Sequence, residues 1–284
     1  MDQQCKTCNF QQGCTHEGHP DDRCMEEIIR KDRLNKIGKK LLVMSGKGGV
    51  GKTSVAVNLA VALTMRGKKV GLLDIDIHGP NIPKMVGLEG KRLAEPSGEL
   101  SPLFIPPSLK VMSIGFLLEK TEEAVIWRGP LKMRIIEQFL TEVTWGELDY
   151  LLIDAPPGTG DEPLTIAQLI PGAEAIIVTT GQEVSLLDVS KSITFCHRTS
   201  MKIAGIIENM SGFSCPHCSH EINLFKTGGG EKLAMEKGIR FLGKIPIDPE
   251  IVNCGDSGKA YVKEYPHAKG SDIFKKIAIE LGVE

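Results

Sequence analysis

Residues 46–53 (GKGGVGKT) have the types and spacing of a loop that binds nucleotide phosphates. An aliphatic stretch precedes them and an Ala/Val/Leu-rich stretch follows, which is the strand–loop–helix setting of the G-x-x-x-x-G-K-[ST] motif. Glycines let successive N–H groups curl around phosphate oxygens, and the helix N-terminus adds positive charge. Lys52 would then reach the β- and γ-phosphates, while the Thr53 hydroxyl would ligate Mg²⁺. The predicted ATP site therefore consists of Gly46, Lys47, Gly48, Gly49, Val50, Gly51, Lys52, Thr53 and Ser54.

Three aspartates follow two apolar stretches that resemble buried strands. Open α/β sheets place ligand-facing residues at the carboxyl ends of their strands. We expect Asp154 to hold Mg²⁺ through water, Asp76 to orient or activate the attacking water, and Asp74 to support the metal or a switch loop. The alternative for Asp154 and Asp74 is a simple turn cap. In the loop after Asp154, Gly158 would offer its N–H to the γ-phosphate and report hydrolysis.

The pair Cys215-x2-Cys218 supplies two thiolates, whereas a [4Fe–4S] cluster or a tetrahedral Zn²⁺ needs four ligands. Two copies of the chain across a two-fold axis would supply all four. The competing arrangement is a zinc site within one chain that is completed by His220 or His217. Cys196 and Cys254 stand alone, and we expect them to be packing thiols.

A second group of cysteines lies in the first 24 residues, which contain very few large apolar side chains. Such a segment cannot build a core and needs a metal or a partner to be ordered. Without an export signal, clustered cysteines favour metal binding over disulfides. The predicted ligands are Cys5, Cys8, Cys14 and Cys24, with His16 or His19 as alternatives to Cys24 and with zinc as the main rival metal.

Composition narrows the classes of partner. The chain has 284 residues and a net charge of −2, so no global basic field favours nucleic acid. No apolar run approaches the roughly 18–20 residues that span a bilayer, and the N-terminus lacks the pattern of a secretory signal. We therefore expect a cytoplasmic protein that binds neither nucleic acid nor membrane.

The remaining sequence predicts an α/β fold that positions these groups. Short apolar stretches alternate with helix-like stretches, which is typical of a doubly wound, mostly parallel sheet. We expect two parts: a cysteine-rich arm and linker helix at 1–37, and a P-loop ATPase domain at 38–284. The Pro- and Gly-rich segments 78–108 and 156–172 are predicted to be loops. The predicted strands are 41–45, 69–74, 110–114, 150–154, 175–180, 203–208 and 241–245, and the predicted helices are 25–37, 52–66, 130–143, 185–199, 230–238 and 271–281.

Several segments resemble the Mrp/Nbp35/ApbC family of iron–sulfur cluster carrier ATPases. They are DIDIHGPNIP from Asp74, WRGP from Trp127, DAPPGTGD from Asp154 and ENMS from Glu208, in that order. The second lysine of the phosphate loop, Lys47, also resembles the deviant loop of the MinD/ParA/nitrogenase-iron-protein group.

The resemblance implies a P-loop homodimer that holds a [4Fe–4S] cluster and passes it to apo-proteins. It implies that Lys47 reaches the partner's nucleotide to stabilise phosphoryl charge, and that Cys215 and Cys218 bridge the cluster across the dimer. It also implies that Asn209 and Pro246 lie near the adenine. The alternative for Lys47 is a solvated surface lysine without a functional role.

The first three arm cysteines, in the spacing C-x2-C-x5-C, resemble the end of the ferredoxin-like cluster site of the Nbp35 branch. That branch has its remaining cysteine well upstream, whereas this chain offers Cys24 downstream. The resemblance therefore implies a second [4Fe–4S] cluster in the arm and leaves its fourth ligand open.

We expect an ATP-binding, weakly hydrolysing scaffold or carrier that assembles [4Fe–4S] clusters and transfers them to client proteins. The alternative is a MinD/ParA-type positioning ATPase with structural zinc sites. Such an ATPase would want a basic amphipathic C-terminal helix, but the segment 271–281 carries two lysines and two acids. A reductase like the nitrogenase iron protein is disfavoured because the two cluster cysteines there lie far apart in sequence.

Overall fold

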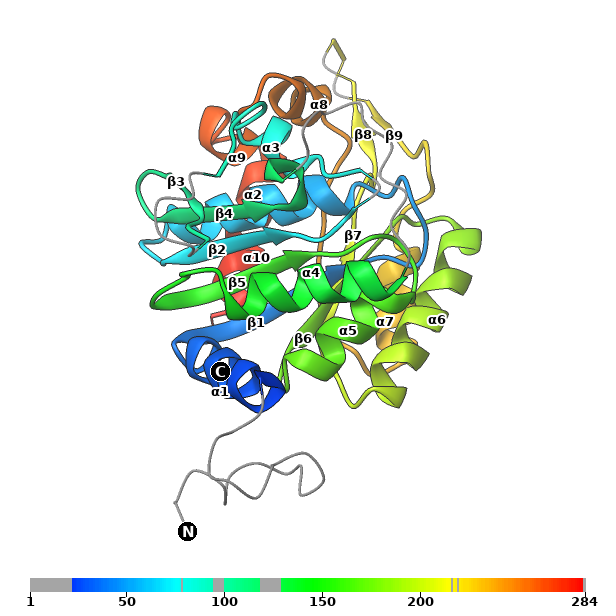
Figure 1. Cartoon of the computed structure of the whole chain (residues 1–284). Coiled ribbons are helices and arrows are strands. Elements are labelled where there is room, and N and C mark those ends of the chain that lie inside the picture. The colour runs from blue at the N-terminus through cyan, green and yellow to red at the C-terminus, as the bar shows by residue number, and fades with distance from the viewer. Residues whose placement is uncertain are drawn as a thin grey trace.

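The computed structural model describes residues 22–77, 79–93, 100–117, 129–215, 217–218 and 220–282. Its centre is an eight-stranded sheet in the order β10-β7-β6-β1-β5-β2-β4-β3 (Figure 1). The edge strand β3 pairs antiparallel with β4, and the other adjacent pairs are parallel. The strands are β1 (Ile37–Met44), β2 (Val70–Asp74), β3 (Leu103–Ile105), β4 (Leu109–Ser113), β5 (Leu148–Asp154), β6 (Glu174–Thr179), β7 (Lys202–Glu208) and β10 (Phe241–Lys244). The expected doubly wound, mostly parallel sheet is confirmed.

Helices cover both faces of the sheet. On one face α2 packs against α10 and α9, and on the other α4 packs against α1 and α5 while α6 packs against α7. The helices are α1 (Asp22–Asn35), α2 (Lys52–Thr64), α3 (Ile82–Met85), α4 (Gly129–Thr141), α5 (Asp161–Leu169), α6 (Glu183–Arg198), α7 (Gly229–Glu236), α8 (Pro249–Asp256), α9 (Tyr261–Glu264) and α10 (Lys269–Glu280). Because both faces are covered, the central strands are almost wholly apolar and buried, as in β2 and β6.

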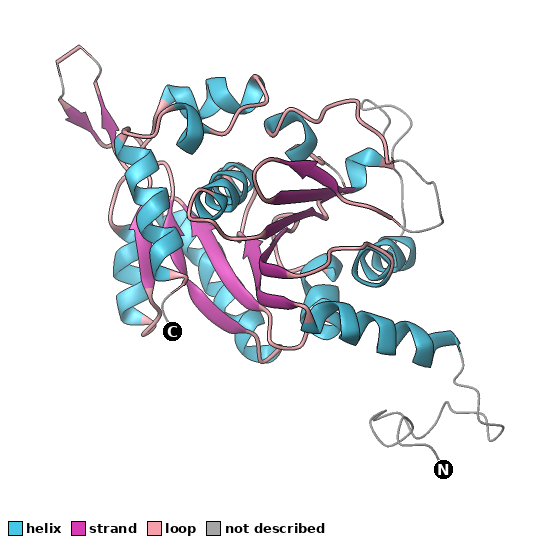
Figure 2. Cartoon of the chain, turned by 90° about the vertical axis from the view of Figure 1, so that its left-hand side faces the viewer, coloured by secondary structure: helices cyan, strands magenta, loops and turns pink. Residues whose placement is uncertain are grey.

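A separate two-stranded hairpin, β8 (Phe213–Ser214) with β9 (Glu221–Ile222), stands out from the body of the domain (Figure 2). It belongs to the connection between β7 and α7. The sequence did not predict this hairpin, because each hairpin strand is only two residues long.

Two segments predicted to be loops contain regular structure. The segment 156–172 holds α5, and the segment 78–108 holds α3 and β3. The Pro- and Gly-rich composition that suggested loops is compatible with a short helix, because proline is tolerated in the first turn. Pro163 lies in the first turn of α5 and Pro83 in that of α3.

The division between arm and domain at residue 37 stays a prediction. In the structure β1 begins at Ile37, and α1 packs against α4 with an ion pair of 2.9 Å between Arg30 and Glu137. The linker helix is thus in contact with the domain. Within the described residues, no helix is both long and apolar enough to span a membrane.

Candidate nucleotide and metal sites

The phosphate loop turns tightly between β1 and α2. Gly49 and Gly51 both have φ near +78°, a conformation that side chains with a Cβ rarely adopt, and Gly51 caps α2. A Cβ on Gly46 would lie 2.4 Å from the backbone of Asp188, so that glycine is required by close packing. The loop borders a cavity of about 440 Å³.

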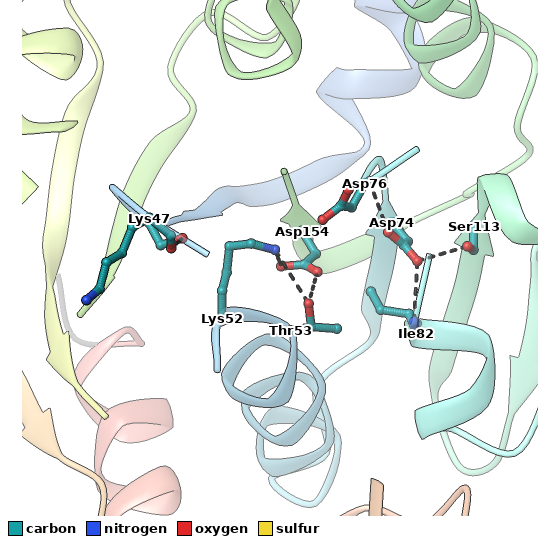
Figure 3. A network of polar contacts seen from close by, with 9 residues as sticks. Lys47, Lys52, Thr53, Asp74, Asp76, Ile82, Ser113 and Asp154 are labelled. Atoms are coloured by element: carbon teal, nitrogen blue, oxygen red, sulfur yellow. Dashed lines mark hydrogen bonds and ion pairs between the residues drawn. The ribbon is translucent and has the colours of Figure 1, made fainter. Parts of the chain in front are cut away.

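A buried ion pair lies at the base of the loop (Figure 3). Lys52 Nζ is 2.5 Å from Asp154 Oδ1, and Thr53 Oγ1 donates to Asp154 Oδ2 at 2.7 Å. The Lys52 and Asp154 side chains are only 6% and 1% exposed. Lys52, expected to bind phosphate, and Thr53, expected to ligate Mg²⁺, are therefore both bonded to Asp154, the carboxylate expected to hold Mg²⁺. A nucleotide must draw Lys52 away from Asp154.

Asp74 organises the neighbouring strand end. Its Oδ2 accepts hydrogen bonds from Ser113 Oγ at 2.9 Å and Ile82 N at 3.4 Å, and its Oδ1 accepts from Asp76 N at 3.1 Å. Complete burial and the nearby Asp154 carboxylate raise the pKa of Asp74 to about 8. Asp74 thus joins β2, β4 and α3 and supports the backbone of Asp76.

Asp76 itself is half-buried and borders the same cavity as Lys52 and Thr53. Lys47 extends away from that cavity (Figure 3), and its Nζ lies 3.3 Å from Gln182 Oε1. Within one chain, Lys47 therefore does not point at the predicted phosphate position. Gly158 N donates to the Ser45 carbonyl at 2.7 Å, so that N–H must leave this bond before it can meet a phosphate.

Part of the cavity wall is formed by residues that were not predicted as site residues from the sequence. Residues of α3 and α8 and the turns beside them face the phosphate loop across it: Asn81, Lys84, Met85, Ile251, Val252, Gly255 and Asp256. Asn81 lies in the motif segment that begins at Asp74, but no motif marks the others, which meet the loop only through the tertiary fold. Asn209 and Pro246 do not line the cavity: Asn209 Nδ2 instead donates to the Val50 carbonyl at 2.8 Å.

The cysteine pair lies at the tip of the β8–β9 hairpin. Cys215 is half-buried and Cys218 is exposed, and Cys215 N donates to the His220 carbonyl at 3.0 Å. Backbone N–H groups of His217 and Cys218 lower the pKa of the Cys215 thiol. Thiolate is the form that binds metal.

Within the described ranges, no group of three or more His, Cys, Asp or Glu side chains is arranged to hold a metal ion. Neither His217 nor His220 therefore completes a site with the two cysteines here. Of the predicted arm ligands, Cys24 is half-buried on α1. Cys5, Cys8 and Cys14 lie outside the described residues, so the arm site stays a prediction. Cys196 and Cys254 are buried.

The fold and the phosphate loop define a P-loop NTPase. The family model described as ParA, the NUBPL iron-transfer P-loop NTPase, matches residues 36–282. The chain belongs to this family, which confirms the resemblance found in the sequence.

Related proteins with names support the same family. The chain is 50% identical over 281 residues to the iron-sulfur cluster carrier protein of Methanocaldococcus jannaschii, covering 97% of this chain and 94% of the relative. It is 47% identical to the human cytosolic Fe-S cluster assembly factor NUBP2 over 255 residues, covering 88% and 93%. These homologues are cluster carrier or assembly factors of the P-loop NTPase class.

Solved structures of related proteins also superpose on this fold. A nucleotide-binding protein from Archaeoglobus fulgidus, solved with ADP, superposes with a TM-score of 0.76 at 42% identity and covers 87% of this chain and 96% of its own. The cell division ATPase MinD of Pyrococcus furiosus superposes with a TM-score of 0.64 at 26% identity, covering 86% and 98%. MinD-like proteins are thus the more distant neighbours.

Proposed function

We propose that the chain is an ATP-dependent carrier that assembles a [4Fe–4S] cluster and transfers it to client apo-proteins. The observation that carries the proposal is a two-cysteine hairpin tip on a P-loop domain, at which no third ligand lies close among the described residues. Two thiolates satisfy half of a four-ligand cluster, so a second copy of the chain completes the set. The names of the relatives support the same cargo.

The nucleotide site has the groups that ATP hydrolysis requires. Thr53 and, through water, Asp154 would hold Mg²⁺, which would supply positive charge against the negative charge that develops during transfer. Lys52 would leave Asp154 for the phosphates, and Thr53 would turn its hydroxyl from Asp154 toward the metal. Asp154 would then be free to accept from water in the metal's coordination shell. Both polar contacts of the buried pair are replaced, so binding leaves no buried charge unpaired.

Asp76 would orient the water that attacks the γ-phosphorus. Its position at the border of the cavity and the hydrogen bond from its N–H to Asp74 support this role. The bond from the γ-phosphorus to the β–γ bridging oxygen breaks, and ADP with inorganic phosphate leaves. Lys47 would act on the nucleotide of the second copy, as its direction away from its own cavity supports. Slow hydrolysis, coupled to cluster loading or release, is part of the proposal.

The homodimer, the cytosolic location and the client proteins also belong to the proposal. One relative is named a cytosolic assembly factor. No observation favours the positioning ATPase: the apolar face of α10, including Phe274 and Ile277, is buried in this domain and is not available as a membrane anchor.

The test is cluster transfer from protein reconstituted without oxygen. The variant carrying both Cys215→Ala and Cys218→Ala should lose the shared cluster and all transfer to an apo-acceptor, while its ATP affinity stays close to wild type. The variant Cys196→Ala is the matched control, since it removes a buried thiol elsewhere. If the double variant transfers clusters as well as wild type, the carrier function does not reside in this pair.

The arm is proposed to hold a second cluster on Cys5, Cys8, Cys14 and Cys24. Replacing the first three by serine should remove about one cluster of iron and sulfide per chain and leave the bridging cluster in place. Elemental analysis decides the matter. Zinc in the wild-type protein, or an unchanged iron content in the variant, would refute the arm cluster and favour a structural zinc site.

A further inference from the structure

Two adjacent residues at the carboxyl end of β7 contact both the phosphate loop and the cysteine hairpin. We infer that Asn209 and Glu208 couple these two sites within one chain, so that nucleotide binding changes the setting of the cysteines. The inference rests on the proposed function, which assigns ATP to the loop and the cluster to the hairpin. It gives Glu208 and Asn209 a positioning role between the two sites.

Asn209 makes the contact with the phosphate loop. Its side chain is buried, and Nδ2 donates to the Val50 carbonyl at 2.8 Å. A Cβ added to Gly51 would lie 2.3 Å from the same Nδ2, so the amide fills the space beside the loop. The Asn209 backbone N–H donates to the Thr179 carbonyl of β6 at 2.7 Å. Any shift of the loop on binding phosphates therefore acts directly on Asn209.

Glu208 holds the base of the hairpin. Its side chain is completely buried, and Oε1 accepts from Ser211 Oγ at 2.5 Å and from Gly228 N at 2.8 Å. Its Oε2 accepts from Gly230 N at 2.6 Å. One carboxylate thus binds the chain both where it leaves for the hairpin and where it returns.

The two halves of this base are also joined to each other. Ser211 Oγ lies 2.6 Å from Thr227 Oγ1, and Ser211 N donates to the Ile245 carbonyl of the neighbouring turn. A Cβ on Gly229 would lie 2.6 Å from the Gly181 carbonyl, so the returning segment packs backbone against backbone.

A buried, fully bonded polar network has few arrangements of similar energy, because each lost hydrogen bond leaves an unpaired buried group. The base of the hairpin is therefore expected to move with Glu208 instead of bending independently. Since Glu208 and Asn209 share a peptide bond, displacement of one reorients the other. The first hairpin strand, β8, begins two residues after Ser211, so a change at this base is passed to the strand that leads to Cys215.

The experiment uses the metal-free full chain and measures the alkylation rates of Cys215 and Cys218 by iodoacetamide, quantified by peptide mass spectrometry. Rates are compared without nucleotide and with Mg²⁺ and a non-hydrolysable ATP analogue. In wild type the analogue should change both rates by about fivefold or more, as expected for a coupled pair of sites. In Glu208→Gln the change should fall below about twofold, because an amide NH₂ then faces backbone donors, while analogue affinity stays within about threefold.

Glu221→Gln is the matched control. It makes the same substitution on β9 of the same hairpin, where Glu221 only forms an exposed ion pair with Lys269, and it should retain the wild-type response. Ser211→Ala removes one of the donors to Glu208 and should reduce the response even if Glu208→Gln does not fold. Restoring the hydroxyl with Ser211→Thr should recover it.

The inference is overturned if wild type shows no nucleotide response, or if Glu208→Gln and Ser211→Ala respond as fully as wild type. The readout needs no cluster, so it is independent of the carrier function. Cysteines that respond to nucleotide yet carry no cluster would refute the proposed cargo and leave the coupling intact.

Discussion

Replacing Lys52 by alanine should destabilise the nucleotide-free protein as well as abolish ATP binding. Lys52 Nζ lies 2.5 Å from Asp154 Oδ1, and both side chains are buried. The variant leaves the buried Asp154 carboxylate without its cation, and within the described residues only the Thr53 hydroxyl still donates to its side chain.

The size of the effect follows from this burial. Removing one partner of a buried ion pair costs about 3–5 kcal/mol, since the remaining charge is uncompensated. With an unfolding entropy of about 2.1 cal/mol/K per residue, a chain of 284 residues loses about 5–8 °C in Tm. Removing both charges in Lys52→Ala with Asp154→Asn should recover most of that loss, although it cannot restore nucleotide binding.

The assay is calorimetric or spectroscopic unfolding at pH 7 in EDTA without nucleotide, because bound ligand would itself raise Tm. Lys226→Ala is the control, since its ion pair with Glu183 is exposed and should contribute little. Equal Tm values for Lys52→Ala and Lys226→Ala would refute the reasoning. So would a double variant that is less stable than Lys52→Ala alone.

Two further predictions concern the same site. The pKa of Asp74 is raised to about 8 in the folded chain, above its unfolded value near 4, so the folded state binds the extra proton and stability falls as pH rises between about 4 and 8. Asp74→Asn should flatten that fall. Unfolding midpoints measured across this pH window test the prediction, and a slope equal to that of wild type would contradict it. Lys47→Ala should bind ATP nearly as well as wild type but hydrolyse it at least about tenfold more slowly, by analogy with other charges supplied across an interface. Steady-state phosphate release measures this, and an unchanged rate would rule out the role across the dimer.

The sequence was sufficient for the sheet and the phosphate loop because both depend on local signals. Aliphatic stretches buried on both faces predict parallel strands, and the glycine spacing of residues 46–53 requires a tight turn before a helix. Boundaries shifted by a few residues, as at β1, which begins at Ile37 instead of 41. The short elements were missed, since α3 has one turn and β8 and β9 have two residues each.

The site was predictable only in part, for a physical reason. Residues at strand ends, such as Asp74 and Asp154, follow from the rule that parallel strands direct their carboxyl ends to one edge. The wall formed by α3 and α8 does not, because it meets the loop through contacts between distant segments. The Lys52–Asp154 pair was also missed: the two residues were assigned separately to phosphate and metal, and nothing local indicates that each holds the other before a ligand arrives.

The topology of the sheet places the proposed cluster site close to the phosphate loop. The loop follows β1 and the cysteine hairpin follows β7, and only β6 lies between these strands. Neighbouring strands lie about 4.8 Å apart, so the carboxyl ends of β1 and β7 are separated by roughly 10 Å. Asn209, directly after β7, crosses that interval to reach Val50. The hairpin therefore extends from the same end of the sheet that forms the phosphate site, so the proposed response of the cysteines to ATP requires no separate domain.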